Sequence, residues 1–183
     1  VVLVLLTYAS AGLRPGNAAF DAQMKVMLDA PMTNKYRVSL QAMVLEEVQR
    51  VKYQKQILKC AQFLVDNQCR NGQWPYSYRN TATKRGGDNS NTQLASLALA
   101  VARAKRVAVP DETFQRLDAF LVATQNADGG YGYSYNQRGD SYASMTAGGA
   151  MMLALTGPKD RPQLKRAFAW LARDFDPACN RAA

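Results

Sequence analysis

Two stretches of this sequence match each other position by position at one constant separation, that between Phe63 and Phe120. Each copy contains an aromatic residue and two aliphatic ones, then a glutamine, a glycine and a group of aromatic residues. The matched positions are Phe63, Leu64, Val65, Gln68, Gly72, Trp74, Tyr76, Ser77 and Tyr78, followed by Phe120, Leu121, Val122, Gln125, Gly129, Tyr131, Tyr133, Ser134 and Tyr135. A third copy begins at Ala169, Trp170 and Leu171. Repetition of this kind indicates similar structural units stacked side by side.

The segments around these motifs show two kinds of helical pattern. Residues 93–104 and 143–155 are apolar almost all round, which is typical of helices covered on both sides. Residues 114–121 and 164–171 instead place apolar side chains three and four positions apart with charges between them, as amphipathic helices do. The sequence therefore predicts an all-α fold of helical hairpins, in which each inner helix pairs with an outer one.

We predict four hairpins, over residues 1–30, 36–68, 91–125 and 142–175, of which the first lacks part of its inner helix. The inner helices are expected near residues 37–50, 92–104 and 142–156, and the outer helices near 54–67, 111–124 and 162–173. The chain opens on the apolar run Val1 to Leu6, which is too short for a signal peptide and follows no initiator methionine. We therefore expect residues 1–183 to be a single repeat domain that begins inside a helix, as a fragment of a longer protein.

The repeated motif resembles the QW repeat of terpenoid cyclases and protein prenyltransferases, also called the prenyltransferase/squalene-oxidase repeat. The first copy reads Lys59-x-x-x-Phe63-Leu64-x-x-x-Gln68-x-x-x-Gly72-x-Trp74, and the second reads Arg116-x-x-x-Phe120-Leu121-x-x-x-Gln125-x-x-x-Gly129-x-Tyr131. The resemblance implies an α/α toroid of helical hairpins. With about four hairpins, this chain would form a partial barrel.

The motif also has a physical logic of its own. A glycine just after a helix can adopt the left-handed conformation that ends it, and a glutamine amide can bind terminal backbone groups that lack partners. The aromatic residue that follows can cover this amide. We therefore interpret six residues as structural staples that hold the units together, in preference to catalytic groups: Gln68, Gly72, Trp74, Gln125, Gly129 and Tyr131.

The sequence contains no histidine. This excludes Ser-His-Asp and Cys-His nucleophile systems and zinc sites with an imidazole ligand, provided that the chain works alone. The DxDD and DDxxD motifs that the resemblance would imply for the two classes of cyclase are missing. The predicted inner helices offer Ala, Leu, Met and Gly where a carbocation would need aromatic faces. We expect no metal and no cofactor, and catalytic residues, if any, would lie mostly outside this segment.

Polar loops lead into two of the predicted inner helices, over residues 85–93 and 138–142. In a toroid these helix starts would surround the same end of the central cavity. The candidate residues of this cavity rim are Asp88, Gln93, Asp140 and Tyr142. The alternative, which we favour, is that the short polar residues only cap the helices. These residues are Asp88, Ser90, Asp140 and Ser141.

The formal net charge is +9, from 23 basic and 14 acidic residues, but no run of five or six like charges occurs. We therefore assign these charges to solvated faces and do not expect nucleic acid as a partner. The cysteines Cys60, Cys69 and Cys179 lack the spacing of metal ligands, and thiols of this kind slightly favour a cytoplasmic location. No apolar stretch is long enough for a transmembrane helix.

Two functions are favoured from the sequence, and nucleic-acid binding driven by the charge of +9 is a third that the salt dependence of retention on heparin would test. The first is a terpenoid cyclase-like or prenyltransferase-like repeat domain that binds an apolar or isoprenoid-type ligand. The second is a non-catalytic helical-repeat module that binds a protein or an extended ligand. An open arc of repeats would also expose apolar inner faces, so we expect either self-association or contact with the remainder of the parent chain.

Overall fold

The computed structural model describes residues 1–76, 86–133, 140–174, 176 and 178. Within them the chain forms seven α-helices and no strand, and the predicted all-α fold is confirmed. The helices are α1 (Val2–Ser10), α2 (Ala18–Asp29), α3 (Lys35–Asp66), α4 (Asn89–Ala104), α5 (Asp111–Thr124), α6 (Ala143–Thr156) and α7 (Pro162–Asp174). None of these helices is long and apolar enough to cross a membrane.

Helix α3 contains a kink at Gln49, where φ is −156° and ψ is 68°. The sequence predicts two helices here, near 37–50 and 54–67, and the structure has two helical stretches that meet at this kink, without the longer break that the prediction left between them. Neither glycine nor proline occurs between Gln49 and Tyr53, so no residue type in this stretch enforces a longer break. The two halves of α3 take the places of the predicted inner and outer helices.

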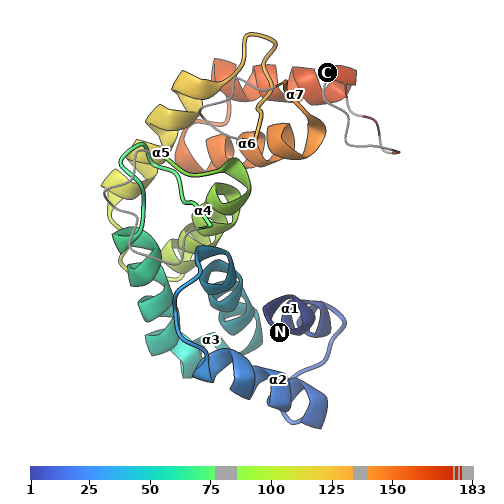
Figure 1. Cartoon of the computed structure of the whole chain (residues 1–183), viewed down its shortest axis with the longest axis vertical. Helices are drawn as coiled ribbons and strands as arrows, with labels where there is room; N and C mark the ends of the chain where they lie inside the picture. The colour runs from blue at the N-terminus through green and yellow to red at the C-terminus, as the bar shows by residue number, and fades with distance from the viewer. Residues whose placement is uncertain (77–85, 134–139, 175, 177, 179–183) are drawn as a thin grey trace.

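The helices follow a curved path, with α1 and α2 at one end and α6 and α7 at the other (Figure 1). Helices α1, α3, α4 and α6 pack against one another in this order, while α5 and α7 both pack against α6. We call α1, residues 35–48 of α3, α4 and α6 the inner row. It lies toward the inside of the curve, and α5, α7 and the second half of α3 lie outside it.

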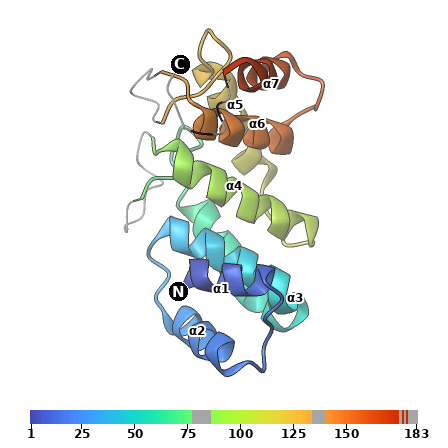
Figure 2. The ribbon, with the colours of Figure 1, turned by 90° about the vertical axis from the view of Figure 1, so that its right-hand side faces the viewer.

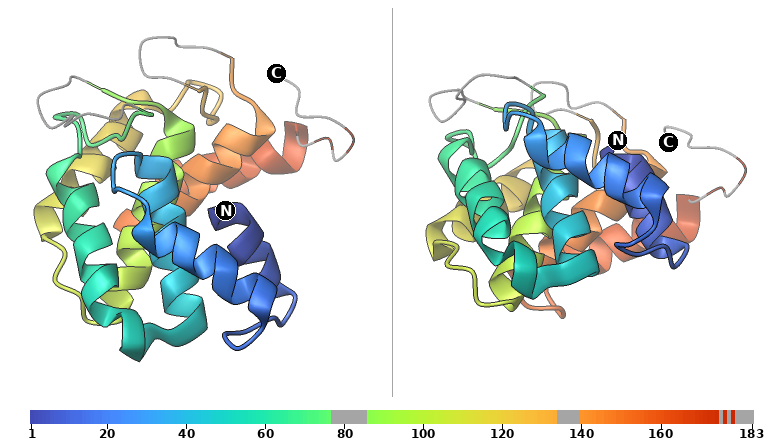
Figure 3. Two further views of the ribbon diagram at one scale, coloured as in Figure 1. Left: turned by 60° about the horizontal axis from the view of Figure 1, so that its bottom comes forward. Right: turned by 90° about the horizontal axis from the view of Figure 1, so that it is seen from below.

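Three helices of the inner row begin at the same edge of the molecule (Figures 2 and 3). We call this side, where α3, α4 and α6 begin, the entry edge. The opposite side carries the kink of α3 and residues 105–110 after α4, and we call it the turn edge. The glycine and the first aromatic residues of the repeated motif lie in the loops that lead to the entry edge. The last motif positions, Ser77, Tyr78, Ser134 and Tyr135, lie outside the described residues.

One hydrophobic core runs through the whole row of helices. Every helix contributes to it, through residues that include Leu5, Phe20, Leu45, Leu99, Leu117, Leu153 and Leu164. At one end of the row, helix α1 and the residue before it leave Val1, Leu3 and Val4 between 40% and 52% exposed.

Candidate functional site

The entry edge is built from helix starts that recur at a constant interval along the chain. Asn34, Asp88 and Tyr142 each precede an inner helix, and the separation between consecutive members is the same. Asn34 Oδ1 accepts a hydrogen bond from the backbone N–H of Arg37 at 3.0 Å, and Asp88 Oδ1 accepts one from Asn91 at 2.8 Å. Both are N-cap interactions. The sequence does not show this period directly, because the three residues differ in type.

Asp88, one of the four predicted rim residues, uses its carboxylate to organise the start of α4. The Ser90 hydroxyl donates to Oδ1 at 2.7 Å, and the Asn91 side-chain amide donates to both oxygens at 3.1 and 3.0 Å. Asp88 is only 9% exposed. Its contacts are those of a helix cap.

The other three predicted rim residues have different surroundings. Asp140 is exposed, and neither it nor Ser141 caps α6, contrary to our expectation, because Tyr142 occupies the N-cap position without a side-chain cap bond. Gln93 points at α6, since a Cβ added to Gly148 would lie 2.1 Å from Gln93 Oε1. Gln93 therefore packs between two inner helices.

Tyrosine side chains lie beside the helix starts in consecutive units. Tyr76 stacks on Tyr36, with ring centroids 6.1 Å apart. The equivalent Tyr133 places its hydroxyl 3.5 Å from the Ser90 hydroxyl, and Ser90, like Tyr36, is two residues past its N-cap. Tyr76 and Tyr133 are 47% and 45% exposed. Tyr36, Tyr76 and Tyr133 are missing from our predicted rim. The recurrence of Tyr76 as Tyr133 in the two motif copies is the sequence signal that indicates two of them.

The Tyr142 phenol lies near Tyr133 at the same edge. Burial raises the pKa of Tyr142, and the neighbouring Tyr133 raises it further. A phenol whose pKa lies above its usual range stays protonated at neutral pH, so Tyr142 offers an aromatic face and a hydroxyl donor to a ligand.

The inner row leaves one narrow face of its helices partly open. Neighbouring helices cover the flanks and the outer helices cover the back, so the open face is the one inside the curve. Its half-buried or exposed residues are Tyr36 and Met43 on α3, Ser90, Gln93, Leu97 and Val101 on α4, and Ser144, Ala147, Met151 and Leu155 on α6. We call these residues the inner face. Its members on α4 and α6 correspond one to one at the interval that separates the helix starts, as Leu97 and Met151 do.

The glutamine of the repeated motif ties each unit to the outer helix of the next unit. Gln68 Nε2 donates to the Gly72 carbonyl at 3.0 Å and to the Thr113 carbonyl, in the first turn of α5, at 2.9 Å. Gln125 Nε2 makes the same pair of bonds, both at 2.8 Å, to Gly129 and to Gln163 in the first turn of α7. The two copies of the motif thus make the same connection.

The aromatic residue of the motif is buried and donates to the end of the preceding helix. Trp74 Nε1 donates to the Leu64 carbonyl at 2.7 Å, and the Tyr131 hydroxyl donates to the Leu121 carbonyl at 2.9 Å. Trp74 is 0% exposed and Tyr131 is 1% exposed. The exchange of Trp for Tyr between the copies therefore preserves both the burial and the hydrogen bond.

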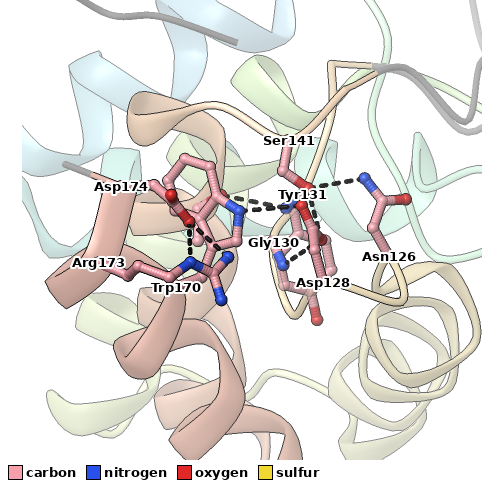
Figure 4. Close-up of polar contacts among 9 residues, drawn as sticks. Asn126, Asp128, Gly130, Tyr131, Ser141, Trp170, Arg173 and Asp174 are labelled. Carbon is pink, nitrogen blue, oxygen red and sulfur yellow. Dashed lines mark hydrogen bonds and ion pairs between the residues drawn. The ribbon is translucent and has the colours of Figure 1, made fainter. Parts of the chain in front are cut away.

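Asp128 joins the second motif loop to α7 (Figure 4). Its Oδ1 accepts from the Gly130 backbone N–H and the Ser141 hydroxyl, each at 2.9 Å, and its Oδ2 accepts from Trp170 Nε1 at 2.9 Å. Burial alone would raise the pKa of this carboxyl, but these three hydrogen bonds, assisted by the charge of Arg173, lower it. Asp128 is absent from the predicted site residues, because its equivalent in the first copy is an asparagine, Asn71.

We expect Asp128→Asn to lower the free energy of unfolding at pH 7 by less than about 1 kcal/mol, because water screens a largely exposed carboxylate. The folded-state pKa of Asp128 lies below its unfolded value, so its stabilisation is present above the unfolded pKa. This stabilisation is lost as the pH falls through the folded pKa. Urea unfolding of the wild type and the variant from pH 7 to pH 3 should show the two stabilities converging in acid.

The exposed Asp140 provides the control, since Asp140→Asn removes a carboxylate outside this cluster. This variant should follow the wild type at every pH. A stability difference for Asp128→Asn that stays constant down to pH 3 would show that the charge of Asp128 contributes nothing.

The described residues contain no group of three or more His, Cys, Asp or Glu side chains that could hold a metal ion. Cys60 and Cys69 are both buried. Burial raises the pKa of the Cys60 thiol to about 12, so this thiol is uncharged and a poor nucleophile at neutral pH. Cys179 lies outside the described residues.

Compared with models of known protein families and with curated proteins, the sequence matches none of them. Function must therefore be inferred from the inner face and the entry edge themselves.

Proposed function

We propose that this chain is a repeat domain of the α/α-toroid type found in terpenoid cyclases and protein prenyltransferases, and that its inner face binds an apolar, isoprenoid-type ligand. The hairpins would then form an open part of a barrel. Two observations support this arrangement. The motif copies make equivalent hydrogen bonds through Gln68 and Gln125. The inner helices begin at the same edge with evenly spaced starts, as at Asn34 and Asp88.

The apolar side chains of the inner face are the observation that indicates an apolar ligand. Leu97 and Val101 on α4 and Met151 and Leu155 on α6 remain half-buried or exposed in the row of inner helices. An apolar ligand laid across α4 and α6 would remove this surface from water, which contributes about 25 cal/mol for each Å² buried.

Two acidic residues near the entry edge support binding in preference to a reaction. Asp88 uses its carboxylate to cap α4, and Asp128 uses its own to hold the motif loop against Trp170. Carboxylates engaged in this way are poorly placed to protonate or ionise a ligand. We therefore assign to this segment the holding of a ligand, with any chemistry supplied by other parts of a parent chain.

A second candidate function is a module for a protein or another extended ligand along the entry edge. The exposed rings of Tyr76 and Tyr133 favour it, because they occur in consecutive units and present aromatic surface at one edge. Exposed aromatic rows of this kind dock extended peptides, proline-rich ones in particular.

Displacement of Nile red by farnesol tests the first function. The double variant Leu97→Gln/Met151→Gln should weaken farnesol binding by about tenfold or more, because each substitution removes apolar contact worth about 1 kcal/mol. The matched control is Leu58→Gln/Val122→Gln, which changes two residues on outer helices that are 47% and 39% exposed. This control should bind farnesol like the wild type.

Equal losses of farnesol affinity in both double variants would show that the inner face is not the farnesol-binding site. Absence of farnesol binding, together with binding of a short polyproline peptide that Tyr76→Ala/Tyr133→Ala abolishes, would replace the first function by the second.

A further inference from the structure

A cavity of about 430 Å³ lies at the turn edge, between the kink of α3 and the residues that follow α4. The turn edge is the side of the inner row opposite the entry edge. Its lining includes Glu46, Arg50, Ile57, Lys105, Arg106 and Val107. Pockets of about 300–1,000 Å³ are typical of sites for small molecules.

The lining combines an apolar floor with an excess of positive charge. Ile57 and Val107 are 2% and 8% exposed. Lys105 forms an ion pair with Glu46 at 3.4 Å. The described residues supply no ion-pair partner to Arg50 or Arg106. Three cations against one carboxylate leave this cavity with two uncompensated positive charges.

Arg106 occupies a backbone position that usually belongs to glycine. Its φ is 66°, and it follows α4 in a turn where the Val107 N–H donates to the Ala102 carbonyl at 3.0 Å. This turn is the Schellman motif, which glycine forms with less conformational strain than any other residue. The fold alone would therefore favour glycine here.

The corresponding cleft between the next two units lacks the excess charge. It has a volume of about 540 Å³ and is lined by Ala100, Arg103, Ala104, Phe114 and Leu155. By the interval that separates the inner-helix starts, Ala100 and Ala104 stand where the first cleft has Glu46 and Arg50. The cation of this second cleft, Arg103, is paired with Asp111. A cleft therefore arises at this place wherever two units pack together. The packing of the units does not explain why the first cleft has two unpaired arginines.

We propose that the cavity at the turn edge binds a small molecule that carries a phosphate monoester and an apolar group. The guanidinium groups of Arg50 and Arg106 bind the phosphate oxygens, for which their planar set of donors is suited. The two uncompensated positive charges match the charge of a phosphate dianion. Ile57 and Val107 contact the apolar group.

Titration of the whole chain with phenyl phosphate, followed by calorimetry, tests this site. Arg106→Gly and Arg50→Gln should each weaken binding about tenfold, as expected when a charge-assisted hydrogen bond is lost. Arg106→Gly should keep the melting temperature of the wild type or raise it, because glycine suits the turn. The control Arg103→Gln removes the same charge from the second cleft and should leave the affinity for phenyl phosphate unchanged.

Two further probes separate the phosphate from the apolar group. Inorganic phosphate and phenol should each bind more weakly than phenyl phosphate. The proposal is overturned if the wild type fails to bind phenyl phosphate at millimolar concentration, if Arg103→Gln weakens binding as much as the other variants, or if inorganic phosphate binds equally well. The titration is independent of the proposed function, because farnesol binding at the inner face should be the same in Arg106→Gly as in the wild type.

Discussion

Trp74→Ala should lower the free energy of unfolding by about 3–5 kcal/mol, as expected for the loss of a large buried aromatic side chain. The Trp74 ring is 0% exposed, and its Nε1 donates to the Leu64 carbonyl at the end of α3. Alanine would leave a cavity there and would remove the indole bond to the Leu64 carbonyl, which keeps only the longer bond from the Asn67 backbone N–H at 3.3 Å. Urea unfolding followed by circular dichroism measures this loss.

Trp74→Tyr provides the matched comparison. Tyr131 occupies the equivalent position of the second copy, where its hydroxyl donates to Leu121 as the indole does to Leu64. Tyrosine should therefore recover most of the stability and cost about 1–2 kcal/mol through the smaller volume of its ring. If alanine and tyrosine lowered the stability equally, neither the packing nor the hydrogen bond would explain the role of Trp74.

Gly72→Ala should destabilise the protein by about 3 kcal/mol or more, through a strained backbone and a clash with α5. Gly72 has a φ of 95°, and a Cβ added there would lie 2.5 Å from the Arg116 carbonyl oxygen. That oxygen belongs to the backbone of α5 and cannot swing aside like a side chain. Relief of the clash would require α5 to move away from the motif loop that Gln68 holds against it.

Gly12→Ala separates the two parts of this effect. Gly12 has a φ of 86°, but a Cβ added there would meet no atom within 4 Å. This variant should lose only the conformational term, about 1–2 kcal/mol. Comparable losses for Gly72→Ala and Gly12→Ala in thermal and chemical unfolding would show that the contact with α5 is unimportant.

The observed helix bounds show which features of the fold a local sequence pattern predicts and which it does not. Helices α4, α5, α6 and α7 begin and end close to the predicted positions, because their hydrophobic periodicity and the prolines between them act over one or two turns of chain. In α3 the two predicted helices are present but meet at the kink at Gln49, because no glycine or proline follows to lengthen the break. The cap assignments were correct for Asp88 and wrong for Ser90, Asp140 and Ser141, because a cap depends on where the helix begins to within one residue.

Side-chain patterns within one unit were enough to predict that the fold is all-α and which stretches pair an apolar helix with an amphipathic one. What lies between units emerged only in the folded molecule: the bond from Gln68 to Thr113, the tyrosines beside the helix starts, and the cavity that unites Arg50 with Arg106. Such contacts join residues far apart in the chain, and they depend on the angles at which helices pack. Side-chain volumes over whole interfaces set those angles, and no local pattern encodes them.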